Sequence, residues 1–128
     1  MAAKDLNYIS GQIVDAAMCV HSALGPGLLE STYSKCLAQE LRLRGLMVEL
    51  EVPVPIVYKG VRIRVAYRMD QLVEDAVVVE LKVVRKLHPV YDAKLLSFLK
   101  LSNRRLGLLL NFNVVHMRDG IKRLVNKF

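Results

Sequence analysis

The sequence predicts an α/β sandwich, in which helices pack on a sheet. Three observations lead to this class. Apolar residues recur every three or four positions near the N-terminus, apolar and polar residues alternate between Met47 and Val83, and a further helical pattern and a short apolar run follow. The order helix, helix, strands, helix, strand is typical of a sandwich. The chain has 128 residues, 53% of them hydrophobic, so we expect one domain over residues 1–128 with its own core.

Two helices are predicted first. An amphipathic pattern runs from Leu6 to Leu24 and ends at Gly25-Pro26-Gly27, which combines a stop signal with a new start. This helix packs either on the core or against a second subunit. The second helix is expected from Leu28 to Arg44, with Gly45 as its C-terminal cap. Its inward positions are Leu29, Tyr33, Cys36 or Leu37, and Leu41.

Extended segments follow the second helix. Alternation from Met47 to Val65 indicates strands, and Lys59-Gly60 is a plausible tight turn between two of them. Pro53 and Pro55 indicate an edge or a bulge. Together with the next hairpin, this segment gives three or four antiparallel strands.

The stretch from Tyr67 to Val83 has the pattern of a hairpin around Glu74-Asp75-Ala76. A three-residue loop places Asp70 directly opposite Glu80 and Arg68 opposite Lys82, whereas a two-residue loop puts the two acids on opposite faces. We predict the three-residue loop. Val77, Val79, Leu81 and Val83 then share one face, and Val78, Glu80 and Lys82 share the other.

The C-terminal part continues the α/β order. Arg85 and Lys86 are expected to be exposed, and Pro89 begins a helix that runs to about Ser102. Leu106 to Asn111 is predicted to form a buried strand. From Arg118 onward the pattern fits a strand or a helix equally well. The inward positions of the helix are Val90, Leu95 or Ala93, Leu96, Leu99 and Phe98.

The facing carboxylates Asp70 and Glu80 suggest a chemistry. Facing acids repel each other unless something neutralises them, and Mg²⁺ is commonly held by one or two carboxylates. Lys82 lies two residues beyond the second acid and could hold an attacking water. The plainer alternative is a solvated hairpin face with weak ion pairs between Asp70 and Arg68 and between Glu80 and Lys82, or a surface lysine at position 82.

These residues resemble a known signature. Asp70, nine intervening residues and Glu80-Leu81-Lys82 are similar to the D…(D/E)xK signature of the PD-(D/E)XK nuclease superfamily. Gly27-Leu28-Leu29-Glu30-Ser31-Thr32-Tyr33 resembles the signature of the GxxExxY protein family of the same superfamily. The resemblance also takes in Val52-Pro53-Val54-Pro55, Tyr58-Lys59-Gly60, Leu106 to Asn113 and Asp119-Gly120-Ile121-Lys122-Arg123.

The resemblance implies a restriction-endonuclease-like αβββαβ core with a mixed, mainly antiparallel sheet, plus an extra N-terminal helix. It implies a nuclease that uses Mg²⁺ or Mn²⁺, with Asp70, Glu80 and the Leu81 carbonyl as ligands and Lys82 as the residue that positions water. Glu30 would lie beside the metal and either ligate it through water or orient a ligand. Its plainer role is a carboxylate that favours the start of a helix.

One helix departs from the related pattern. Related nucleases show Gln-x-x-x-Tyr in the helix after the site, where this chain has Lys94 and Phe98. Either the helix contacts phosphate through Lys94, or the catalytic constellation is partly degraded. The alternative function is therefore a nucleic-acid-binding or assembly module that keeps the fold without catalysis.

The charge favours a polyanionic substrate. The chain carries a net charge of +7, and residues 65–128 hold twelve Lys or Arg against six Asp or Glu. We expect DNA as the substrate, because phosphate contacts supply most nonspecific affinity for nucleic acid. A homodimer or a larger assembly would suit so small a chain. The candidate phosphate contacts are Arg68, Arg85, Lys86 and Lys94.

Several other classes are not favoured. No long uncharged apolar run and no signal-peptide pattern are present, so we expect a cytoplasmic protein without membrane contact. Cys19 and Cys36 are interpreted as reduced, buried or half-buried thiols. The spacing of His21, His88 and His116 does not suit zinc. The sequence contains no phosphate-binding glycine loop and no Gly-x-Ser-x-Gly motif.

Overall fold

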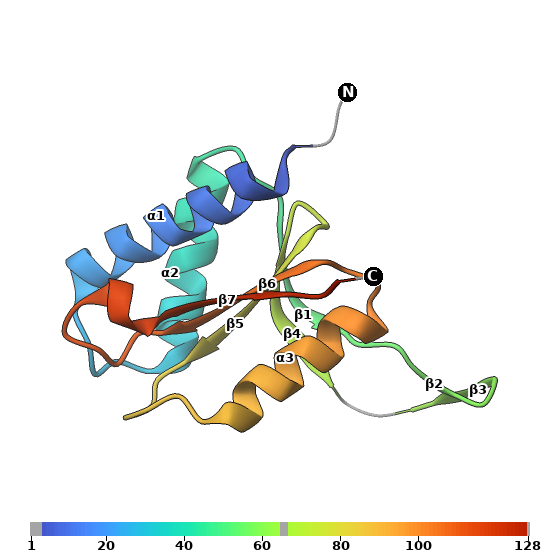
Figure 1. The fold of residues 1–128 in the computed structure, drawn as a ribbon. Coiled ribbons are helices and arrows are strands. Elements are labelled where there is room, and N and C mark those ends of the chain that lie inside the picture. The colour runs from blue at the N-terminus through green and yellow to red at the C-terminus, as the bar shows by residue number, and fades with distance from the viewer. Residues whose placement is uncertain (1–3, 65–66, 128) are drawn as a thin grey trace.

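Helices cover both faces of a five-stranded sheet in the structure, a computed structural model that describes residues 4–64 and 67–127 (Figure 1). The strand order is β1-β4-β5-β6-β7, and only the pair β5 and β6 is parallel. A mixed sheet with three α-helices confirms the predicted fold class. The elements are α1 Leu6–Leu24, α2 Glu30–Leu43, β1 Val48–Pro53, β2 Ile56–Tyr58, β3 Val61–Ile63, β4 Arg68–Val73, β5 Val77–Lys82, α3 Pro89–Leu101, β6 Leu106–Asn111, the 3-10 helix η1 Met117–Gly120 and β7 Ile121–Val125.

Each face of the sheet carries its own hydrophobic cluster. One lies under α1 and α2 and includes Ile13, Leu37 and Val79. The other lies under α3 and includes Val78 and Leu95. Alternate side chains of β5 therefore enter different clusters, as its alternating pattern predicts. The polar members of this strand lie on the α3 face.

The N-terminal helices agree closely with the predicted pattern. Helix α1 has the predicted bounds and packs on α2 and the sheet, which is the first of the two alternatives (Figure 1). The prediction that Leu29 points inward is wrong, because its backbone is extended, it precedes the first helical residue and its side chain is 74% exposed. The two cysteines are free, and Cys36 is half-buried, but the prediction fails for Cys19, which is exposed on α1.

The segment between β1 and β4 forms a separate hairpin. Strands β2 and β3 pair only with each other and project from the body of the molecule (Figure 1). Lys59 and Gly60 both have positive φ, as the predicted tight turn requires. Strand β1 lies at the edge of the main sheet and ends at Pro53, which agrees with the edge prediction. Val65, the last residue of the predicted extended pattern, lies outside the described residues.

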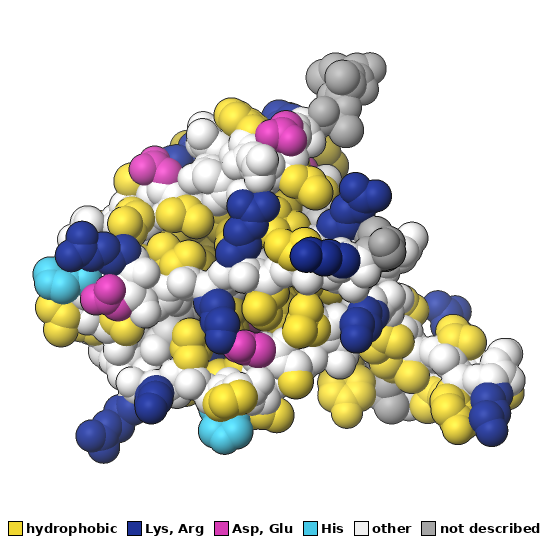
Figure 2. All heavy atoms as spheres, in the orientation of Figure 1, with side chains coloured by type: hydrophobic (Ala, Val, Ile, Leu, Met, Phe, Trp, Pro, Cys, Tyr) yellow, Lys and Arg dark blue, Asp and Glu magenta, His cyan; other side chains and the backbone are white. Residues whose placement is uncertain are grey.

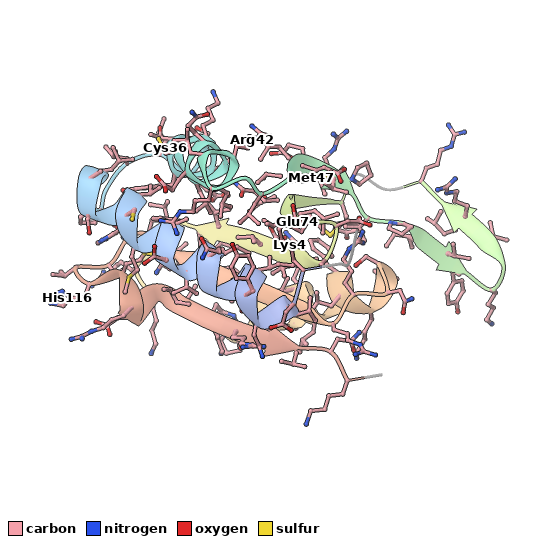
Figure 3. All side chains as sticks on the ribbon, turned by 90° about the horizontal axis from the view of Figure 1, so that it is seen from above. Lys4, Cys36, Arg42, Met47, Glu74 and His116 are labelled. Atoms are coloured by element: carbon pink, nitrogen blue, oxygen red, sulfur yellow. The ribbon has the colours of Figure 1, made fainter. Side chains whose placement is uncertain are left out.

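The β4–β5 hairpin has the predicted three-residue loop. Val73 lies opposite Val77 and Gln71 lies opposite Val79, which is the register of the odd loop. Glu74 anchors the loop, because its carboxylate accepts a hydrogen bond from the Met47 backbone N–H at 2.6 Å and from Lys4 Nζ at 2.9 Å (Figure 3). The same two bonds, with that from Met47 the larger influence, lower the pKa of Glu74.

The remaining elements complete the sheet. Strand β6 is buried along its length, as predicted, and β7 resolves the open alternative at the C-terminus as a strand that pairs antiparallel to β6. In α3, Leu95, Phe98 and Leu99 are buried, but the inward assignment of Val90 is wrong because it lies exposed in the first turn. No helix within residues 4–64 and 67–127 combines the length and hydropathy that a membrane span needs.

Candidate active site

Asp70 and Glu80 meet at the end of the β4–β5 ladder. The backbone N–H of Asp70 donates to Glu80 Oε2 at 3.1 Å, and the backbone N–H of Leu81 donates to Asp70 Oδ2 at 2.8 Å. Each carboxylate thus accepts a hydrogen bond from a backbone N–H of the facing strand. The three-residue turn fixes this register, because a shift of one residue would move one acid to the other face.

Burial dominates the electrostatics of this pair. Glu80 is only 6% exposed, and burial raises its pKa to about 9, with a further rise from the hydrogen bond and negative charge of Asp70. Lys94 lowers the same pKa. In the part of the chain that the structure describes, neither acid forms an ion pair, so the ion-paired hairpin face is not the arrangement found. Burial therefore favours a state of this pair in which a proton or a cation reduces its negative charge.

Lys82 lies on the same face of β5 as Glu80 and is half-buried. Its Nζ lies 4.5 Å from the centroid of the Tyr91 ring, which holds the ammonium group by a cation–π contact. Sequence reasoning missed Tyr91. Its position in the first turn of α3, three residues before Lys94, is the signal that would have placed it on the site side of the helix.

Lys94 contributes a second cation from α3. Its charge lowers the pKa of both Glu80 and Glu30, which places its ammonium group within electrostatic reach of these acids. Its Nζ also lies 5.4 Å from the centroid of the Phe98 ring. Phe98 itself belongs to the buried cluster under α3. Two positions depart from the pattern of related nucleases. Lys94 lies within electrostatic reach of the acids, and Phe98 is in the core.

Glu30 reaches the same region from α2. Burial and the charge of Asp70 raise the pKa of Glu30, while Lys82 and Lys94 lower it. Glu30 is the first residue of α2, where the helix dipole favours a negative charge. The three predicted carboxylates thus come from α2, β4 and β5, and Glu30 lies within electrostatic reach of Asp70.

The start of α2 is held by residues of the same sequence motif. The Tyr33 hydroxyl donates to the Gly25 carbonyl and accepts from the Leu28 N–H at 3.1 Å, and its ring stacks on Phe112 at 4.6 Å. Tyr33 is fully buried. Its role in the structure is to fix the turn that precedes Glu30.

Two buried polar side chains add long-range bonds that sequence reasoning missed. Gln71, next to Asp70 in β4, donates from Nε2 to the Ser34 carbonyl of α2 at 2.8 Å. Among the described residues, its Oε1 has no hydrogen-bond partner. Asn111, at the end of β6, bonds both the N–H and the carbonyl of Val84, at 3.1 and 2.9 Å. No local pattern marks these bonds, because Ser34 lies 37 positions from Gln71 and Val84 lies 27 positions from Asn111.

The oxygen chemistry of the acid pair fits a hard divalent cation. A buried carboxylate pair without a cationic partner is neutralised by a proton or a metal ion, and Mg²⁺ commonly takes one or two carboxylates with waters. Within residues 4–64 and 67–127, no group of three or more His, Cys, Asp and Glu is arranged to hold a metal. Glu30 is thus near the pair without forming a three-carboxylate cluster with it.

The other predicted cations lie further out. Arg68 lines a hollow with Pro53 and Arg62. The β4–β5 pairs that the structure records end at Gln71 and Val79, so the predicted placement of Arg68 opposite Lys82 stays a prediction. Arg85 and Lys86 are exposed between β5 and α3, as predicted. Figure 2 shows Lys and Arg side chains scattered over this view of the surface, with fewer acids among them.

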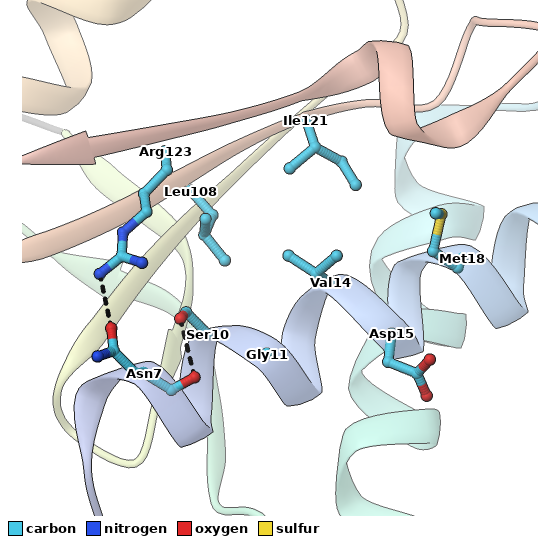
Figure 4. A pocket seen from close by; sticks show the side chains of 9 residues that line it. All are labelled: Asn7, Ser10, Gly11, Val14, Asp15, Met18, Leu108, Ile121 and Arg123. Carbon is cyan, nitrogen blue, oxygen red and sulfur yellow. Dashed lines mark hydrogen bonds between the residues drawn. The ribbon is translucent and has the colours of Figure 1, made fainter.

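A second hollow, between α1 and β7, lies apart from these residues (Figure 4). It holds about 680 Å³, and Arg123 donates to Asn7 Oδ1 there at 3.0 Å. None of the candidate site residues lines it. Ser10 donates to the Asn7 carbonyl at 3.2 Å, and Asp15 pairs with Arg44, which does not line the hollow, at 2.7 Å, so these polar groups already have partners.

Comparison with known proteins agrees with this geometry. The family model described as the PD-(D/E)XK nuclease superfamily matches residues 7–124, which is most of the chain. No curated protein and no solved structure matches the chain.

Proposed function

The chain belongs to the PD-(D/E)XK nuclease superfamily, and we propose that it is a metal-dependent nuclease that hydrolyses phosphodiester bonds in DNA. The observation that carries this proposal is the buried Glu80 against Asp70, with Lys82 following on the same strand face. Such a pair is costly for the apo protein, because burial disfavours its charged form. If the site binds a cation, the charge of the ion offsets the energetic cost of burying the two acids.

Asp70, Glu80 and the Leu81 carbonyl would hold Mg²⁺ or Mn²⁺, and Glu30 would support the ion through water. When bound, the ion would supply positive charge for the attacking and leaving oxygens. Lys82, held at the Tyr91 ring, would orient the attacking water through its ammonium group. Because the ammonium carries donors only, its part is to position the water by hydrogen bonding.

Lys94 would take the place of the glutamine found in related nucleases. Its charge already acts on Glu80 and Glu30, so a phosphate beside these acids would lie within its field. Arg85 and Lys86, exposed beyond β5, would contact the backbone further along. Phe98 would keep the packing of α3 without offering a hydroxyl.

We also propose that the chain is a GxxExxY protein. The support is that each of the three motif positions has its own structural role around the start of α2. Gly27 has a φ of 95°, Tyr33 bonds the turn from the core, and Glu30 then starts α2 beside Asp70. The motif thus orients a carboxylate toward the site.

Metal-dependent cleavage is the direct test. Labelled single- and double-stranded DNA is incubated with Mg²⁺ and one of four proteins: wild type, Asp70→Asn, Lys82→Ala, or the control Lys100→Ala, which changes an exposed lysine in the last turn of α3. We expect cleavage by wild type and the control, and loss in the other two variants. Equal activity in all four proteins would indicate a contaminant.

The alternative function is a non-catalytic nucleic-acid-binding module. The replacement of a hydroxyl by Phe98 favours it. Intact DNA binding together with the absence of Mn²⁺ binding at millimolar concentration would support this alternative.

A further inference from the structure

We propose that the β2–β3 hairpin and Arg68 at its base, here called the basic arm, bind the sugar–phosphate backbone of a polynucleotide beside the acid pair. The arm comprises residues 54–64 together with Arg68. The inference rests on the proposed function for its substrate class, because both need a nucleic acid. It does not depend on cleavage.

The charge of the arm is one-sided. Between residues 52 and 69 the chain has Lys59, Arg62, Arg64 and Arg68 and no Asp or Glu. Four uncompensated positive charges in so short a segment create a strong local potential for polyanions. In Figure 2 the projecting part at the right carries blue and yellow side chains and no magenta on the face shown.

The four cations of the arm differ in ion pairing from other arginines of the chain. In the described part of the chain, none of them forms an ion pair. Elsewhere arginines are held by carboxylates: Arg44 pairs with Asp15 at 2.7 Å and Arg104 with Asp75 at 2.6 Å. The arginines of the arm are therefore available for a ligand with acceptor oxygens, and guanidinium groups suit phosphate.

The geometry of the arm suits an extended ligand. Val57 lies opposite Arg62, and Tyr58 lies opposite Val61, so the hairpin has one face with Arg62 and one face of apolar and aromatic side chains. Tyr58 is 65% exposed. A hairpin that pairs with no other strand is marginally stable in water, and its exposed apolar atoms would gain from being covered. A two-stranded ribbon is also of a size that the major groove of DNA admits.

The arm is continuous with the acid pair. Arg68 begins β4, and Asp70 follows two residues later on the same strand. Arg62, Arg64 and Arg68 line one hollow of about 840 Å³ at the base of the arm. Arg68 therefore links the hollow to the strand that carries Asp70.

A second copy of the chain is the rival occupant for the apolar face of the arm. Two arms brought together would each carry the same four cations with no acid between them. Like charges at close range oppose such pairing. Charge complementarity therefore favours a polyanion.

The test is binding without cleavage. A fluorescent 30-nucleotide single strand and the corresponding duplex are titrated in EDTA with the wild-type chain, Arg62→Gln/Arg64→Gln and the control Lys35→Gln/Arg118→Gln, over a range of salt concentrations. The control removes the same charge from exposed residues at the end of the molecule near Cys36 and His116, away from the arm (Figure 3). Circular dichroism checks that all three are folded.

The arm variant should bind about tenfold or more weakly at 50 mM salt, and the slope of log K against log salt should fall by about 2, one for each lost phosphate contact. The control should match wild type. Comparing strand and duplex shows which form supplies the backbone.

Three results would overturn the inference: no nucleic-acid binding by wild type, equal affinity and slope in wild type and the arm variant, or a monomer–dimer equilibrium that the arm variant alone abolishes. Failure of the proposed function would look different. In that case Mg²⁺ would give no cleavage, while arm-dependent binding in EDTA would persist.

Discussion

Replacing Glu80 by glutamine should stabilise the metal-free protein at neutral pH, and the gain should grow as the pH rises. The pKa of this carboxyl is about 9 in the folded chain against an ordinary value of 4.5. A raised carboxyl pKa means that the folded state holds the proton more tightly than the unfolded state. Its contribution to stability is therefore greatest below pH 4.5 and is lost progressively up to pH 9.

The magnitude follows from the proton linkage. Between these two pKa values the wild type loses about 1.4 kcal/mol of unfolding free energy for each pH unit. At pH 7 the loss amounts to roughly 3 kcal/mol. Glu80→Gln avoids this loss, because the amide stays neutral, keeps an acceptor for the Asp70 N–H and can donate to the Asp70 carboxylate.

Urea unfolding of both proteins in EDTA at several pH values between 5 and 8 measures the difference. We expect the difference in unfolding free energy to rise by about 1.4 kcal/mol per pH unit, and Mg²⁺ to stabilise the wild type more than the variant. A difference that does not change with pH, or a variant that is less stable than wild type at pH 8, would refute the reasoning.

Three further substitutions test other parts of the structure. Lys82→Met should lower kcat about 10²–10⁴-fold while leaving Mn²⁺ binding intact, as measured by cleavage assays and calorimetry. Gly120→Ala should cost about 3 kcal/mol of unfolding free energy in urea titration, because the added Cβ would lie 2.1 Å from the Asn111 carbonyl oxygen. Tyr33→Phe should cost about 1–3 kcal/mol in the same assay, because it leaves the Leu28 N–H without its partner.

Two of these predictions have a matched control. Gly107→Ala should cost only about 1 kcal/mol, because its Cβ would meet the movable Leu95 side chain at 3.0 Å. Tyr8→Phe removes an exposed hydroxyl and should change little. If each control costs as much as its test variant, the buried contacts named above are not the cause. A Lys82→Met protein that still cleaves at the wild-type rate would exclude Lys82 from water positioning.

The register of the β4–β5 hairpin was predictable from sequence, but the contacts that hold its loop were not. An odd loop between two apolar runs is visible locally, and it fixes which acids face each other. The structure adds that Glu74 and Asp75 both have a φ of 53° and that Glu74 bonds Met47 and Lys4. Those partners are 27 and 70 positions away, so only the fold brings them to the loop.

Periodicity predicted where the helices and strands lie better than it predicted what surrounds them. It places Leu29 on the inward stripe of α2, but the helix begins one residue later and leaves that side chain exposed. Alternation and the Lys59-Gly60 turn likewise predict that β2 pairs with β3, but they do not tell whether this hairpin joins the main sheet. It forms a two-stranded sheet of its own, because membership of a larger sheet depends on contacts that are distant in sequence.

The candidate site was predictable where chemistry is written in residue type and spacing. Asp70, Glu80 and Lys82 follow from a strand pattern of period two. Tyr91 and Gln71 do not, because a ring beneath an ammonium and an amide bonded to a distant helix leave no periodic trace. Buried side-chain bonds of this kind emerge only when the elements are packed.

Calorimetric titration with Mn²⁺ tests the central claim most directly, which is that Asp70 and Glu80 together form one site for a divalent cation. Near pH 7 the wild type should bind one ion per chain and release a proton, because the pKa of Glu80 is raised to about 9 before the ion binds. Asp70→Asn should lose that binding. Absence of binding to wild type at millimolar Mn²⁺, or identical binding to both proteins, would contradict the account.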